Sequence, residues 1–141
     1  MKNLFIAVAL FVTLAGFSGK KYVTIGRVET AGRLEIELIY QIQGVDTIYT
    51  INFRNENTKK PEIKSLSFTG SECLNKIHGS ISSAFKEKYF EQVLIVDGKE
   101  IRIGRMNSHV MLFMDYSHCT ISRNMVEKIF GKRKNYLKNR I

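Results

Sequence analysis

The sequence predicts an α+β domain built on an antiparallel sheet, and three observations support this class. Apolar and polar residues alternate over several short segments, as in strands with one buried face. Near Thr69 the apolar spacing changes to three and four residues, as in an amphipathic helix. The pair Asp97-Gly98 then separates two apolar segments, as in a tight hairpin. We expect one curved, meander-type sheet of about seven strands, with a main helix packed on it and a shorter C-terminal helix.

The N-terminal segment has the pattern of an export signal. Lys2 precedes an apolar segment from Leu4 to Phe17, and small residues and a basic pair follow it. The apolar segment has about fourteen residues, whereas a membrane-spanning helix needs about twenty. We therefore expect residues 1–18 to be a signal peptide, cleaved near Ala15 or Ser18, and the mature protein to be secreted or periplasmic. An uncleaved membrane anchor and a buried first strand or helix are the alternatives.

The segment after the N-terminal signal predicts the first strands of the sheet. Residues 21–29 and 33–43 flank a turn, and residues 45–53 alternate in the same way after a second turn. This pattern indicates an antiparallel meander with one solvated face. Residues 54–61 are polar and hold the chain's single proline, so they are interpreted as a solvated connection, with a binding loop as the alternative. Residues 62–68 predict a fourth, weaker strand.

The main helix is predicted next. Thr69-Gly70-Ser71-Glu72 fits a capping box, in which Thr and Glu side chains satisfy the backbone donors of a helix start. Apolar residues from Leu74 to Tyr89 then recur at helical spacing. Gly79 costs helix stability, which predicts that another backbone packs closely there.

The second half predicts a hairpin, a strand and a helix. Residues 92–96 and 99–105 should pair with Leu94 opposite Ile101. Residues 108–116 are apolar on both faces, which predicts an interior strand covered on both sides or by a dimer partner. Residues 121–130 predict a helix that begins near Asn124 and Glu127 and ends or kinks at Gly131. The order of four strands, a helix, three strands and a helix indicates a repeated unit of strands closed by a helix.

The two cysteines, Cys73 and Cys119, predict a disulfide in an exported protein. Such a bridge would hold the main helix to the sheet and contribute about 4 kcal/mol through chain entropy. Two separate buried thiols are the alternative, and a nucleophilic pair of Cys119 and His118 is a weaker one.

Motifs of catalysis are missing from the sequence. It contains no glycine-rich phosphate loop, CxxC pair, HExxH or GxSxG. A metal site from His109, Asp115 and His118 is conceivable, but six residues of strand would separate its ends by about 20 Å. We therefore predict no catalytic residue, no metal site and no cofactor.

Charge gives the remaining functional signal. The net charge is +9, which favours anionic partners. We expect a single domain over residues 19–131 and a basic C-terminal tail over residues 132–141, with no acidic residue after Glu127. Basic residues interleaved with aromatic ones suit anionic surfaces, although a merely solubilising tail has the same composition. The anion-binding candidates are Lys128, Lys132, Arg133, Lys134, Tyr136, Lys138 and Arg140.

These observations together predict an exported, non-enzymatic binding or inhibitor module. Its partner would be an acidic protein, an anionic envelope polymer or a membrane surface, and nucleic acid is less favoured. The alternative is a small secreted hydrolase whose site is assembled from dispersed residues.

Overall fold

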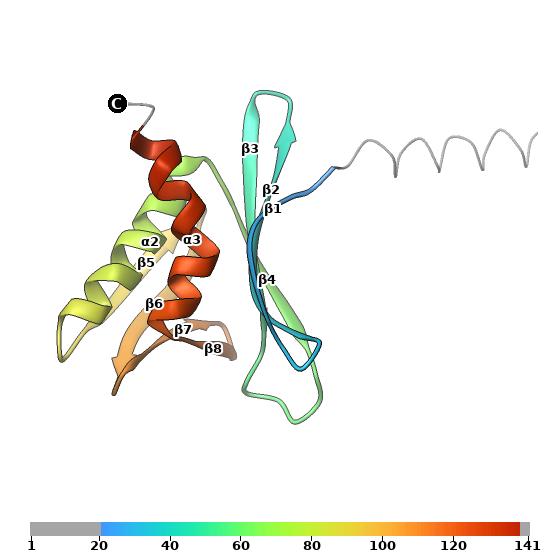
Figure 1. The fold of residues 1–141 in the computed structure, drawn as a ribbon. Coiled ribbons are helices and arrows are strands. Elements are labelled where there is room, and N and C mark those ends of the chain that lie inside the picture. The colour runs from blue at the N-terminus through green and yellow to red at the C-terminus, as the bar shows by residue number, and fades with distance from the viewer. Residues whose placement is uncertain (1–20, 139–141) are drawn as a thin grey trace, which may run out of the picture.

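The structure, a computed structural model, describes residues 21–138. These residues form an α+β fold in which four strands and a helix are followed by four more strands and a second helix (Figure 1). The elements are β1 (Val23–Thr30), β2 (Arg33–Gln43), β3 (Asp46–Arg54), β4 (Ile63–Thr69), α2 (Ser71–Lys86), β5 (Glu91–Val96), β6 (Lys99–Met106), β7 (His109–Met114), β8 (Ser117–Ile121) and α3 (Arg123–Lys138). The predicted α+β class is confirmed, and the second half has four strands before its helix where three were predicted.

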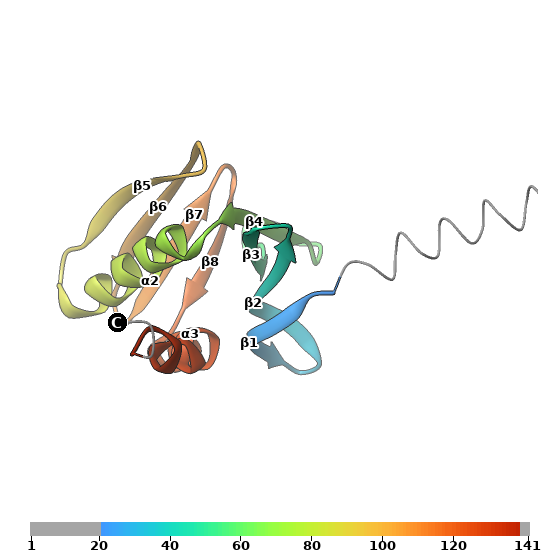
Figure 2. The same ribbon diagram turned by 90° about the horizontal axis from the view of Figure 1, so that it is seen from above.

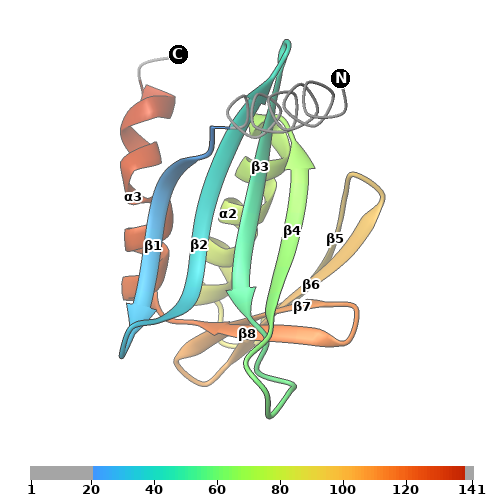
Figure 3. The ribbon, with the colours of Figure 1, turned by 90° about the vertical axis from the view of Figure 1, so that its right-hand side faces the viewer.

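The strands form two sheets, so the predicted single sheet of about seven strands is wrong. The first sheet has the order β1-β2-β3-β4, the second has the order β5-β6-β7-β8, and all neighbouring strands are antiparallel. Helix α2 separates β4 from β5 in the chain, and the ladder does not continue across it. Figure 2 shows α2 lying along one face of the second sheet, and Figure 3 shows α3 beside β1 of the first sheet.

One hydrophobic core joins both sheets and both helices. The first sheet contributes large side chains such as Phe53 and Phe68, and the second contributes Ile101 and Ile103. Helix α2 adds the buried stripe Leu74, Ile77, Ile81, Ala84 and Phe85. Because these residues form a single buried cluster, neither half of the repeated order has a separate core.

The main helix is confirmed, but its predicted start is wrong. Thr69 ends β4, and its backbone N–H donates to Asp97 Oδ2 at 2.6 Å instead of beginning a capping box. Gly70 is the N-cap, with φ of 87° and no side-chain cap. Gly79 is also not a point of close packing, since no atom lies within 4 Å of a Cβ placed there.

The second helix is longer than predicted. It runs through Gly131 to Lys138, so glycine does not end it, and residues 132–138 of the expected tail belong to α3. Its first turn is held by Ser122, whose Oγ accepts the Met125 N–H at 3.3 Å, and not by Asn124. A glycine inside a helix costs only about 1 kcal/mol, which packing of α3 against β1 can offset.

The predicted hairpin of the second half is confirmed, including Leu94 opposite Ile101. Asp97 and Gly98 both have positive φ, as a tight hairpin turn requires. Strand β7 lies between β6 and β8, as its two apolar faces predicted. Its inner residues Val110 and Leu112 are buried, whereas Met111 and Phe113 line an open hollow on the outer face.

Within residues 21–138, no helix has the length and hydropathy needed to cross a membrane.

Candidate anion-binding site

The predicted basic residues lie on and beyond α3. Lys128 is exposed on this helix. The structure gives only the helical backbone for Lys132, Arg133, Lys134, Tyr136 and Lys138, and Arg140 lies outside the described residues. The proposal that these side chains bind anions therefore remains a prediction.

A second basic group lies where the sequence did not predict one. A hollow of about 280 Å³ is lined by residues from the start of β2 and from the loop between β3 and β4. Figure 3 shows this loop and the β1–β2 turn at the same end of the first sheet. The basic side chains that line the hollow are Arg33, Arg54, Lys59 and Lys60.

Most of this positive charge is not compensated. Arg54 pairs with Glu35 at 2.6 Å, which neutralises it. Among the described residues, Arg33, Lys59 and Lys60 form no ion pair. Three cations at the rim of one hollow create a positive potential that favours an anionic group.

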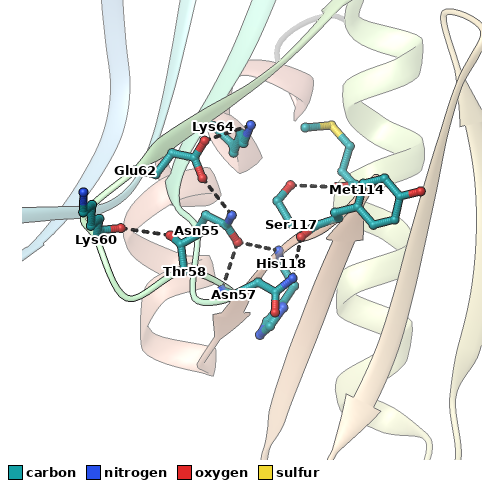
Figure 4. Close-up of polar contacts among 10 residues, drawn as sticks. Asn55, Asn57, Thr58, Lys60, Glu62, Lys64, Met114, Ser117 and His118 are labelled. Atoms are coloured by element: carbon teal, nitrogen blue, oxygen red, sulfur yellow. Dashed lines mark hydrogen bonds and ion pairs between the residues drawn. The ribbon is translucent and has the colours of Figure 1, made fainter.

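The β3–β4 loop is held in place by Asn55, which is only 4% exposed (Figure 4). Its Oδ1 accepts the backbone N–H of Asn57 at 3.0 Å and that of His118 at 3.2 Å. Its Nδ2 donates to Glu62 Oε2 at 3.1 Å. One buried amide therefore closes the loop on itself and joins it to β8 of the other sheet.

Three further contacts fix the loop on the β7–β8 hairpin. The Glu56 N–H donates to the His118 carbonyl at 3.0 Å, and Glu56 Oε2 accepts from Thr120 Oγ1 at 2.7 Å. Asn57 Nδ2 donates to the Tyr116 carbonyl at 2.7 Å. Glu56 also lines the basic hollow, where its carboxylate accepts from Thr120 and lies 3.7 Å from His118 Nε2, and the cations of the hollow still outnumber it.

Glu62 closes the loop from the side of β4. The hydrogen bond from Asn55 and the ion pair with Lys64 hold the pKa of this carboxyl below its ordinary value. Its folded pKa is depressed, so its contribution is present above the ordinary pKa and is lost as the pH falls through the folded pKa. Protonation of Glu62 at acid pH therefore weakens the closure of the loop.

The predicted disulfide is absent, because Cys73 and Cys119 are both free thiols. Cys73 Sγ lies 3.8 Å from Asp97 Oδ1, beside the β5–β6 turn. Cys119 lies on β8, which is two strands from β6 and three from β5.

The structure shows two separate thiols, as in the first alternative, with Cys119 buried and Cys73 half-buried, and it does not bring Cys119 and His118 together as a nucleophilic pair. Cys119 faces the core and is 4% exposed, whereas His118 points to the other face of β8, where its ring lies 5.6 Å from that of Phe113. Burial raises the pKa of the Cys119 thiol, which disfavours a nucleophilic thiolate. No group of three or more His, Cys, Asp or Glu residues within residues 21–138 is placed to hold a metal ion.

The sequence carried only a partial signal for the basic hollow. Lys59 and Lys60 are adjacent in a polar segment for which a binding loop was the alternative interpretation. Arg33 belongs to a different turn and reaches the same hollow only because β2 pairs with β3. Neither a family model, nor a curated protein, nor a solved structure matches this chain.

Proposed function

We propose that the protein is an exported, non-enzymatic binding or inhibitor module whose basic surface holds an anionic partner. An acidic protein, an envelope polymer or a membrane surface would supply suitable groups. The observation that carries this proposal is the set of uncompensated cations, Arg33, Lys59 and Lys60, around one hollow. Export rests on residues 1–18, which lie outside the described residues.

The loop that presents these cations is suited to binding because it is already ordered. Asn55, Glu56 and Asn57 each bond to the β7–β8 hairpin or to β8. A partner that binds a fixed loop does not have to order it first, and this reduces the entropic cost of association.

The two basic regions lie at opposite ends of the molecule. In Figure 1 the C-terminal end of α3 points toward the same end of the molecule as the β2–β3 turn, whereas the β3–β4 loop lies at the other end of the first sheet. Strand β2 alone has eleven residues and spans about 35 Å between these ends. A partner that contacts both regions must therefore be extended, as a polymer or a membrane surface is.

Charge reversal at each end tests the proposal. We expect Lys59→Glu with Lys60→Glu to lower the salt concentration at which the mature protein elutes from heparin, and to weaken its binding to vesicles containing an anionic lipid. Lys132→Glu, Lys134→Glu and Lys138→Glu test the α3 end in the same two assays. The matched control is Lys76→Glu with Lys88→Glu, which changes the net charge as much as the loop variant but lies outside both regions.

The control separates a site from general attraction by net charge. If the control variant loses as much retention as the loop variant, the hollow is not a site. If the loop and α3 variants both bind as the wild type does, the proposed function is wrong.

A further inference from the structure

We propose that β5 is a docking strand to which a partner adds an extended segment of alternating basic and apolar residues. The added segment would extend the second sheet by one strand, with its basic side chains on the outer face and its apolar side chains beside half-buried Leu94. This proposal is independent of the anion-binding site at the other sheet.

The free edge of β5 is defined by its pairing with β6. The Phe90 carbonyl accepts the Arg105 N–H at 2.9 Å, so Phe90 and every second residue after it direct their backbone groups toward β6. Glu91, Val93 and Ile95 therefore direct their N–H and C=O groups away from the sheet. Within residues 21–138, no hydrogen bond reaches these groups, and they form a ready template for another strand.

At two other sheet edges, side chains or a loop already bond to some of the outward backbone groups. At β8, Asn55 accepts the His118 N–H, and the His118 carbonyl accepts the Glu56 N–H. At β4, Asp97 accepts the Thr69 N–H, and Lys99 donates to the Ser67 carbonyl at 3.0 Å.

The fourth edge, β1, is protected by its shape and by a helix. Its pairing with β2 contains two register shifts, between Thr24 and Gly26 and between Val28 and Glu29, and α3 packs against it. Bulges of this kind discourage strand addition. Strand β5 has no register shift, no proline and no covering element. Of the four edges, it alone lacks protection within the described residues.

The surface beside this edge indicates the chemistry of the occupant. Val93 is 47% exposed and Ile95 is 63% exposed. The same face holds a hollow of about 640 Å³ whose lining includes Met111, Phe113 and the backbone of Gly104. Apolar side chains therefore supply contact area next to the free backbone groups.

Carboxylates outnumber guanidinium groups among the charged residues of this hollow, by three to two. Glu91, Glu100 and Asp115 line it. Arg102 lies 3.5 Å from Glu91, and Arg105 donates to the carbonyls of Phe85, Glu87 and Asn107. The lining thus carries one more carboxylate than guanidinium groups, and on a protein of net charge +9 this excess favours basic side chains over acidic ones.

Amide exchange in the mature protein tests the edge directly. In the free protein we expect the amides of Glu91, Val93 and Ile95 to exchange rapidly, and those of Gln92 and Leu94 to be protected. The probe is the capped peptide Lys-Val-Lys-Ile-Lys-Val-Lys, which should slow exchange at the three edge amides at least tenfold. The acidic analogue Glu-Val-Glu-Ile-Glu-Val-Glu should not.

Two changes remove the backbone contact, a proline in β5 and N-methylation of the peptide. Val93→Pro removes an N–H that β6 does not use, and Val93→Thr is the matched control that keeps it. We expect at least tenfold weaker peptide binding for the proline variant and near wild-type binding for the threonine variant. The same peptide with N-methyl groups on alternate residues should fail to bind the wild type, which tests the pairing even if the proline variant does not fold.

Three outcomes would overturn the proposal. The first is slow exchange of the edge amides in the free, dilute protein, which would mean that the chain covers its own edge. The second is protection that increases with protein concentration without peptide, which would identify a second copy as the occupant. The third is equal binding of the basic and acidic peptides.

Discussion

His118 and Cys119 show how the two faces of a strand separate neighbouring residues. Cys119 is buried against the core, whereas His118 contacts Glu56 and Phe113 on the other face. Adjacent side chains in a strand point in opposite directions, so two neighbours cannot act on one substrate atom. A short polar sequence can therefore resemble a catalytic group without forming one.

The state of the two thiols gives a prediction at this scale. We expect Ellman's reagent to find two free thiols per unreduced molecule in denaturant, and only one in the native protein. The native reaction should come from half-buried Cys73 and should be slow near neutral pH, because burial and then the Asp97 carboxylate raise its thiol pKa. Its rate should rise with pH as the thiolate forms.

One variant serves as the control for this prediction, and one result would contradict it. Cys73→Ala is the control, and it should abolish the native reaction while leaving one thiol in denaturant. Absence of any thiol in unreduced, denatured protein would restore the disulfide.

At the scale of the elements, the sequence predicted the strands with one-sided burial and missed β8. The helical spacing of apolar residues predicted α2, and the pair Asp97-Gly98 predicted the β5–β6 turn. Both predictions succeeded because each signal comes from residues that are close together in the sequence. Strand β8 contains Ser117, His118 and Thr120, which bond to neighbouring segments, so hydropathy does not mark it as a strand. The preceding turn places Asp115 at φ of 51°, and its sequence lacks the glycine that marks such turns.

The grouping of strands into sheets was not predictable in the same way. Alternation shows which side of a strand is buried, but it does not show which strand pairs with which. The same limit applies to the candidate site, because Arg33 and Lys59 meet only through the pairing of β2 with β3.

Packing of α3 on β1 gives a prediction at the element scale. A Cβ at Gly26 would overlap the Lys128 carbonyl oxygen and would lie 2.5 Å from the Ile129 Cα. Both contacts are with backbone, so α3 would have to shift as a unit. We expect Gly26→Ala to lower the free energy of unfolding by about 1–3 kcal/mol, measured by urea denaturation.

Gly79→Ala is the matched control for this change. No atom lies within 4 Å of a Cβ at Gly79, and this residue lies inside α2. The substitution should therefore stabilise the protein by about 1 kcal/mol. Equal effects of the two substitutions would show that α3 does not pack on the Gly26 backbone.

On the scale of the whole molecule, the outer surfaces differ in what they leave unpaired. The outer face of the first sheet carries a chain of hydrogen bonds across all four strands, in the order Glu29, Arg27, Glu37, Asn52 and Ser65. Polar groups satisfied in this way have little to gain from a partner. The uncompensated cations near the β3–β4 loop and the free edge of β5 are therefore the surfaces that leave groups for a partner to engage.

The seam between the sheets depends on Asn55, which gives a prediction for the molecule as a whole. Asn55→Ala would leave the N–H groups of Asn57 and His118 without an acceptor, and it would remove the bond to Glu62. Asn55 is buried, so we expect a loss of about 2–3 kcal/mol in the free energy of unfolding. Asn57→Ala, which removes one exposed bond to the Tyr116 carbonyl, should cost less than about 1 kcal/mol.

Urea unfolding followed by circular dichroism and by tyrosine fluorescence measures both variants. Because the two sheets share one core, both signals should report a single transition at the same urea concentration for each variant. Similar losses for Asn55→Ala and Asn57→Ala would show that the buried amide does not hold the seam. Separate transitions would show that the two halves unfold independently. The ordered conformation of the β3–β4 loop would then depend on the first sheet alone.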